Sequence, residues 1–122
     1  MAKLISRQMH GVADYAYAAF FSAAPESVGF EDEKAAAALS RVVAGGVTLT
    51  SLLTRYELGL IRVLPFKAHL AADVAVGLLT LGAPWFFGFS DNEKARNTFV
   101  AMGAFSVVAG LITDPKEMKP ER

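Results

Sequence analysis

Two copies of one pair of ionisable side chains lie in otherwise apolar stretches of the chain. His10 and Asp14 are four residues apart, and His69 and Asp73 repeat that spacing. Residues at i and i+4 share one face of a helix, so each pair can interact. If the two pairs face each other, their imidazoles and carboxylates could hold a proton in a shared network or bind a divalent metal ion. The sequence therefore predicts a candidate ion, proton or metal site at these four residues.

A structural role for the same residues is the main alternative. Each histidine could bond to the aspartate of its own helix, or a pair could tie one helix to its neighbour. Both pairs lie near the starts of their apolar stretches, so they could also sit at the membrane interface rather than at depth. Duplication favours symmetric packing as much as a symmetric site, so the sequence leaves both interpretations open.

The elements that position these pairs are four windows with few charges. Of the 122 residues, 53% are hydrophobic and 20% charged, and the windows between the charges span residues 10–25, 35–54, 69–84 and 97–113. Alanine-rich stretches of this length without an interior proline favour helix. Pro25 and Pro84 stand at the ends of the first and third windows, where we expect those helices to stop. We expect an all-α fold of four helices.

These helices suit a membrane better than water. Spanning a bilayer takes about 20 apolar residues. The window 97–113 carries no charge on any face, and the window 35–54 carries only Arg41, whereas a soluble bundle helix normally shows a charged stripe. We therefore expect a four-transmembrane-helix bundle, with an alanine-rich soluble bundle as the alternative.

The charges outside the windows predict an orientation. Segments 1–9, 55–68 and 114–122 hold eight basic residues, whereas segments 26–34 and 85–96 hold three basic and six acidic residues. The positive-inside rule then places both termini in the cytoplasm of a multi-pass inner-membrane protein. The N-terminal segment does not look like a cleaved signal, because the apolar stretch after it carries two ionisable residues. We expect the first helix to remain in the mature protein.

The chain also contains an internal repeat. With an offset of 59 residues, twelve of 45 aligned positions are identical, and those that are not alanine are His10/His69, Asp14/Asp73, Pro25/Pro84, Gly29/Gly88, Phe30/Phe89, Asp32/Asp91, Leu52/Leu111 and Thr54/Thr113. We therefore expect one membrane domain, residues 1–122, with repeats at about 10–54 and 69–113 and an interfacial linker at 55–68. Two crossings per repeat give both copies the same orientation, so a pseudo-two-fold axis along the membrane normal should relate them.

A family resemblance is carried by the second repeat, which runs Ala83-Pro84-Trp85-Phe86-Phe87-Gly88-Phe89-Ser90. It resembles the SPW repeat, a prokaryotic membrane hairpin named for Ser-Pro-Trp after its first helix, with alanine in place of the serine. The first repeat is degenerate, because Glu26 stands at the tryptophan position. The stretch from Tyr56 through Asp73 is similar to the junction in four-helix members. The resemblance covers His10 to Thr113, and it implies an integral membrane protein and no particular reaction.

Other residues predict how the bundle sits and packs. Aromatic side chains belong to the interfacial belt of membrane proteins, and we expect such anchors at Trp85, Phe86, Phe87 and Phe89. Small residues let helices approach closely, and we expect such contacts at Gly45, Gly46, Gly77, Gly82, Gly103 and Gly110. The linker alternates charged and apolar residues, so it could lie along the inner headgroup region.

The function predicted from these features is coarse. The chain has no phosphate-binding loop, nucleophile elbow or zinc-protease motif, so we expect no enzyme, no catalytic residue and no cofactor. Zero net charge argues against a nucleic-acid partner. The expected partner is the lipid bilayer, with a homo-oligomer or another membrane protein left open. The first hypothesis is a structural or interaction module, and the alternative is a small transporter or an ion-, proton- or metal-handling protein that uses His10, Asp14, His69 and Asp73.

Overall fold

The computed structural model describes residues 3–119; Arg122, one of the basic residues counted above, lies outside the described residues. Within that range the chain forms four α-helices, one π-helical turn and no strand. The elements are α1 (Arg7–Ala24), η1 (Pro25–Gly29), α2 (Lys34–Leu53), α3 (Phe66–Phe86) and α4 (Glu93–Ile112). The predicted all-α, four-helix architecture is confirmed.

Polar side chains satisfy the free amides at three helix starts. Ser6 and Asn92 cap α1 and α4, each accepting an amide hydrogen bond from the helix at 3.1 Å. Pro65 precedes α3 and has no such side chain. There the Glu117 carboxylate, from the segment after α4, accepts the amides of the first two residues of α3 at 2.9 and 3.0 Å. The end of the chain thus helps to start the third helix.

The two prolines meet the expectation differently: α1 ends at Ala24, directly before Pro25, whereas α3 continues for two residues past Pro84. Pro84 lies inside α3, and Pro25 opens η1 directly after α1. A proline lacks the N–H but its carbonyl still accepts, and in both repeats it binds the amide of the phenylalanine five residues later at 2.8 Å. The turn η1 ends at Gly29, and α3 ends at Phe86, two residues before Gly88; the φ angles of these two residues, 99° and 77°, suit glycine. The repeat therefore extends to the detailed shape of this turn.

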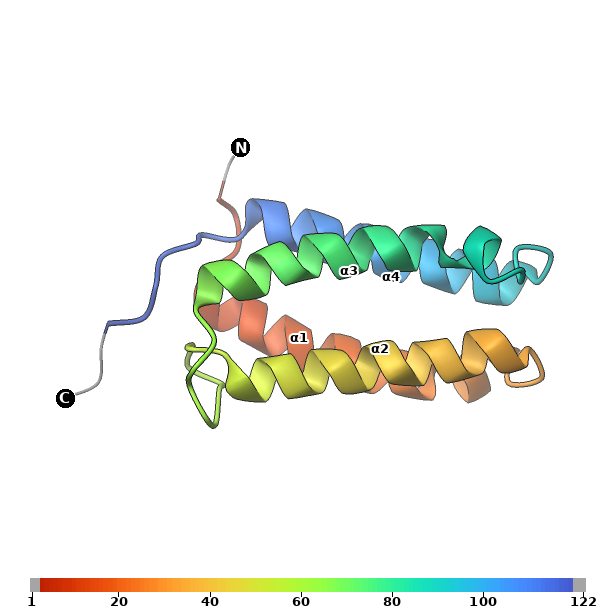
Figure 1. The fold of residues 1–122 in the computed structure, drawn as a ribbon, viewed down its shortest axis with the longest axis horizontal. Helices are drawn as coiled ribbons and strands as arrows, with labels where there is room; N and C mark the ends of the chain where they lie inside the picture. Colours follow the sequence, from red (N-terminus) through yellow and green to blue (C-terminus); the bar gives the residue numbers. More distant parts are fainter. Residues whose placement is uncertain (1–2, 120–122) are drawn as a thin grey trace.

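The helices form two antiparallel hairpins, α1 with α2 and α3 with α4. Figure 1 shows the two hairpin turns at one end of the bundle, and the linker and both ends of the chain at the other. At this second end Ile5 pairs with Thr113, and Leu64 pairs with Thr54, as isolated parallel bridges. Ile5 and Leu64 are 59 residues apart, and so are Thr54 and Thr113, so the two bridges are equivalent in the repeat. The pseudo-two-fold symmetry therefore extends beyond the helices.

The second hairpin is held by a close approach of its two helices. A Cβ added to Gly103 would lie 2.5 Å from the amide nitrogen of Leu81 and 2.7 Å from the carbonyl oxygen of Gly77. Gly110 is similarly tight against the side chain of Val74, at 2.8 Å. The packing role predicted for these glycines is confirmed, because only a residue without a side chain permits such backbone contact.

The remaining predicted packing glycines are open. A Cβ at Gly45, Gly46 or Gly82 meets nothing within 4 Å. Small size permits a close contact but does not create one, and open space lies beside these three positions. The prediction of close helix contacts at these glycines is wrong within this chain.

Aromatic side chains fill the half of the core near the hairpin turns. Phe21, Phe30, Phe89 and Phe99 are fully buried, and the Phe99 ring lies 4.9 Å from the Phe21 and Phe89 rings. The expected interfacial role is therefore wrong for Phe89, because the turn at the preceding glycine points its ring inward. The other three expected anchors, Trp85, Phe86 and Phe87, are exposed.

The two seams between the hairpins are filled differently. On the α1–α4 seam the rings of Tyr17 and Phe105 lie 6.0 Å apart. The equivalent residues on the α2–α3 seam are Val76 and Gly46, and that seam carries an apolar groove of about 340 Å³. The fold is thus symmetric in its backbone and asymmetric in the side chains that close it.

Helix composition places the bundle in a membrane. Helices α2, α3 and α4 are each long and apolar enough to cross a bilayer. Helix α1 has 18 residues and includes Arg7, His10 and Asp14, which lower its hydropathy; it lies antiparallel to α2 over the same length (Figure 1). The protein is therefore a membrane protein whose least apolar helix carries half of the candidate site.

Candidate functional site

The two His–Asp pairs converge into one buried tetrad. His10 Nε2 lies 2.7 Å from Asp73 Oδ2 and 3.2 Å from Asp14 Oδ1. His69 Nε2 lies 3.0 Å from Asp14 Oδ2 and 3.3 Å from Asp73 Oδ2. Each imidazole thus touches both carboxylates, and in each case the shorter contact crosses from one hairpin to the other.

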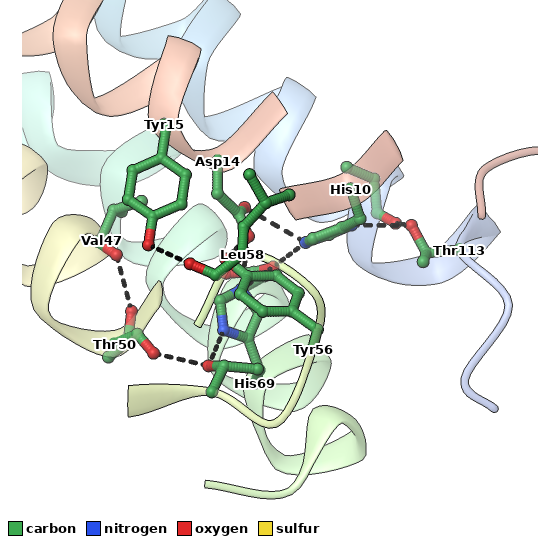
Figure 2. Close-up of polar contacts among 12 residues, drawn as sticks. His10, Asp14, Tyr15, Val47, Thr50, Tyr56, Leu58, His69 and Thr113 are labelled. Atoms are coloured by element: carbon green, nitrogen blue, oxygen red, sulfur yellow. Dashed lines mark hydrogen bonds and ion pairs between the residues drawn. The ribbon is translucent and has the colours of Figure 1, made fainter. Parts of the chain in front are cut away.

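Two threonines hold the outer nitrogens of the imidazoles. His10 Nδ1 lies 2.8 Å from Thr113 Oγ1, and His69 Nδ1 lies 2.7 Å from Thr54 Oγ1. Figure 2 shows His10 between Thr113 on one side and Asp14 on the other. Each threonine directly follows the second helix of one hairpin and contacts a histidine in the first helix of the other hairpin. Thr54 follows α2 and contacts His69 of α3, and Thr113 follows α4 and contacts His10 of α1. The pseudo-two-fold therefore repeats this contact as well.

The threonines also decide which ring nitrogen carries hydrogen. Thr54 Oγ1 donates to the carbonyl oxygen of Thr50, and Thr113 Oγ1 donates to that of Ala109, both at 2.5 Å. Since each hydroxyl proton is used in this way, the oxygen accepts from His Nδ1–H. Nδ1 is then a donor in both rings, and both Nε2 atoms face the carboxylates. An Nε2 in this position must hold either a proton or a cation, because a bare lone pair would face negative oxygen.

One member of the site breaks the symmetry. The phenol of Tyr56, in the segment between α2 and α3, donates to Asp14 Oδ2 at 2.9 Å. Burial raises the pKa of Tyr56 and the Asp14 carboxylate raises it further, so the phenol remains a donor. The position equivalent to Tyr56 in the second repeat is Pro115, so Asp73 has no such partner.

The tetrad is enclosed on both sides along the bundle. Toward the linker, the fully buried rings of Tyr56 and Phe66 cover the imidazoles, with Phe66 5.6 Å from His10. Toward the hairpin turns the aromatic core begins one helical turn past Tyr17. Between them lies a cavity of about 20 Å³, lined by His10, Ala13, Asp14, Tyr17, Val47, Asp73, Phe105, Ser106 and Ala109. That volume holds about one water molecule or one ion.

Two buried side-chain polar atoms of the described residues lack a hydrogen bond of good geometry, Ser51 Oγ and, within the tetrad, His69 Nε2. His69 Nε2 is inaccessible to solvent and has no hydrogen-bond partner, although two carboxylate oxygens lie within 3.3 Å of it. Buried polar groups are almost always satisfied, so an exception needs a physical reason. Here the nitrogen lies within ion-pair distance of both carboxylates but makes a hydrogen bond of good geometry to neither.

The sequence identified the tetrad but missed the residues that orient it. Thr54 and Thr113 are identical across the repeat, and that identity was the available signal for their role. Tyr56 gave no such signal, because it has no counterpart in the second repeat. Arg41, the one charge in its window, pairs with Glu26 near the hairpin turns and not with the tetrad.

The fold and the site define a class of protein. It is a membrane-embedded α-helical bundle in which two tandem hairpins, related by a pseudo-two-fold, enclose a cluster of ionisable side chains. The family model for the SPW repeat domain matches residues 8–113, and the chain belongs to this family. No curated protein and no solved structure matches the chain. The resemblance seen in the sequence is thereby confirmed.

Proposed function

We propose that the protein handles cations in the inner membrane, with both termini in the cytoplasm. In this proposal His10, Asp14, His69 and Asp73 take up protons or a metal cation within the bundle and pass them across the membrane. The orientation is supported by the excess of basic residues at the end of the bundle that carries the linker and the termini.

The convergence of the four side chains is the observation that carries the proposal. Ionisable residues inside a membrane bundle are costly, and where they face the interior they mark ion pathways or relays. The tetrad has this position, because its side chains come from both hairpins and are at least mostly buried. Transporters built from repeats place their sites at the repeat interface near the bilayer midplane; the tetrad shares the repeat interface and lies near the linker end, with His10 and His69 at the fourth residues of α1 and α3.

Cation flux in proteoliposomes tests this function. Vesicles containing the full chain receive a proton gradient or a Zn²⁺ gradient, and internal dyes report each cation. We expect flux of at least one cation above protein-free vesicles, and a loss of at least about tenfold in Asp73→Asn, since a positioned ionisable group is removed. Asp91→Asn, in the exposed turn after α3, is the matched control. Flux no faster than in empty vesicles for both cations would refute the proposal.

A structural module is the second candidate, and one observation favours it. The shorter contact of each imidazole joins the two hairpins, so the tetrad stabilises the packing of one hairpin against the other. In that case, replacing Asp73 would weaken the bundle while no variant and no gradient produced flux. The same vesicles and a thermal unfolding measurement therefore separate the two candidates.

A further inference from the structure

We propose that the tetrad binds one divalent metal ion of the zinc class, with His10 Nε2, His69 Nε2 and one oxygen each of Asp14 and Asp73 as ligands. The inference rests on the proposed cation-handling function and names the cation. Three properties of the tetrad support it: its dimensions, the direction of its nitrogens, and its charge.

The dimensions fit a four-coordinate ion. One ligand atom from each residue can be chosen so that all four lie within 4.8 Å of one another. The closest nitrogen–oxygen separations range from 2.7 to 3.3 Å; both imidazoles contact Asp73 Oδ2, whereas His10 contacts Asp14 Oδ1 and His69 contacts Asp14 Oδ2. Zinc bonds to nitrogen and oxygen ligands imply tetrahedral edges of about 3.3–3.5 Å. The closest contact, at 2.7 Å, would have to widen by about 0.6–0.8 Å, and any separation that approaches 4.8 Å would have to shorten to match these edges.

The nitrogens already point as zinc ligands do. Metal-bound histidines usually donate their second N–H to an oxygen, which fixes the tautomer and the ring. Thr54 and Thr113 supply that oxygen for His69 and His10. The solvent-inaccessible His69 Nε2 has no hydrogen bond in the protein. A metal ion between the carboxylates would bind this nitrogen directly, in place of its ion-pair contacts at 3.0 and 3.3 Å.

The charge and donor types select the ion. Two carboxylates carry two negative charges, which one divalent cation neutralises while both imidazoles are neutral. Each Nε2 then gives its lone pair to the ion, and any proton it held leaves to solvent. Calcium and magnesium prefer sites made of oxygen alone, whereas a mixed set of imidazoles and carboxylates suits zinc and its neighbours.

Zinc binding to the purified full chain in nanodiscs tests the inference. With Zn²⁺ alone as the probe, we expect one ion per chain after exhaustive dialysis. With Co²⁺ as a substitute, we expect the intense visible absorption of a four-coordinate ion. A stoichiometry near zero, or the weak spectrum of a six-coordinate aqueous ion, would overturn the proposal.

Variants of a threonine beside the ligands test the metal site even if variants of the ligands themselves fail to fold. His69→Gln should abolish the Co²⁺ spectrum. Thr54→Val should weaken zinc binding by about 10–100-fold, as loss of an outer hydrogen bond does in known zinc sites. Thr98→Val is the matched control, since the Thr98 hydroxyl makes the same bond to a helix carbonyl, that of Lys94, at 2.8 Å. Equal affinity of the two threonine variants would contradict the proposed ligand set.

The two proposals fail separately. Bound zinc without flux of any cation would leave the metal site in place and remove the transport function. Proton flux without zinc binding would remove the metal site and leave cation handling in place.

Discussion

His10 lies closer to Asp73, on the other hairpin, than to Asp14, four residues along its own helix. The Nε2–oxygen separations are 2.7 and 3.2 Å. His69 shows the same preference, with 3.0 Å to Asp14 and 3.3 Å to Asp73. The i, i+4 spacing thus brings each pair to the right face, while the favoured partners come from opposite repeats. The tetrad couples the two hairpins rather than stiffening each helix.

A double-mutant cycle should therefore find the stronger coupling between hairpins. We expect a coupling free energy of about 1–3 kcal/mol for His10→Gln with Asp73→Asn, and a smaller value for His10→Gln with Asp14→Asn. Unfolding in mixed micelles measures both cycles.

The surface pair Arg7–Glu57, 2.7 Å apart, is the control for that cycle. Both side chains are part-exposed, so the coupling of this pair should lie below about 1 kcal/mol. A coupling free energy for His10 with Asp14 equal to that for His10 with Asp73 would contradict the conclusion that the tetrad couples the two hairpins.

Tyr56→Phe should destabilise the bundle by about 1–3 kcal/mol, because it leaves the buried Asp14 oxygen without its phenol donor. Tyr15→Phe is the matched control: its hydroxyl donates to the Leu58 carbonyl in an exposed position, and its loss should cost clearly less. Equal losses in the two variants would show that the Asp14 contact adds nothing.

The same phenol predicts a pH dependence at high pH. Burial and then the charge of Asp14 raise the pKa of Tyr56 in the folded protein. The unfolded chain ionises its tyrosines near pH 10, so the contribution of Tyr56 is complete below that pH and is lost as pH rises above it. The stability difference between the native protein and Tyr56→Phe should shrink from pH 8 to pH 11. A difference that stays constant over this range would contradict the prediction.

Two glycine-to-alanine substitutions should have opposite signs. Gly103→Ala places a Cβ 2.5 Å from the amide nitrogen of Leu81, so α3 and α4 must separate, at a cost of about 1–3 kcal/mol. Gly82→Ala meets nothing within 4 Å and should stabilise α3 by up to about 1 kcal/mol, since alanine favours helix. Thermal unfolding in one detergent compares them. Destabilisation of equal size would show that backbone contact is not what holds this hairpin.

The repeat made much of the site predictable. Identity of the His–Asp pairs, together with two crossings per repeat, implied a pseudo-two-fold, and such an axis brings equivalent residues of the two first helices together. Other residues that are identical in the two repeats also indicate structural roles. Thr54 and Thr113 match across the repeat and orient the imidazoles. Phe89 matches Phe30, and both rings are buried, whereas the exposed aromatic residues before Phe89 have no aromatic counterpart in the first repeat.

Other features could not be predicted from the sequence. The contact of Tyr56 with Asp14 depends on the path of the linker, which has no counterpart after α4. The open space beside Gly45 and Gly46 depends on the rotation of α2 about its axis. The sequence does not determine that rotation, because a glycine is compatible with a close helix contact and with none. The position of Pro84 inside α3 depends on the turn that follows the helix. In that turn the amide of Phe89, five residues later, donates a hydrogen bond to the Pro84 carbonyl.

The orientation of the bundle can be tested cleanly, because the chain contains no cysteine. Single cysteines at exposed positions, Asp91→Cys in the turn after α3 and Leu60→Cys in the linker, lie at opposite ends of the bundle. In intact cells, a membrane-impermeant maleimide should label the first variant and spare the second, because the linker end carries the excess of basic residues. Glu31→Cys, in the first hairpin turn, should behave as Asp91→Cys does, since both repeats insert with the same orientation. Labelling of Leu60→Cys in place of the turn variants would reverse the orientation, and labelling of one turn without the other would break the tandem arrangement on which the tetrad depends.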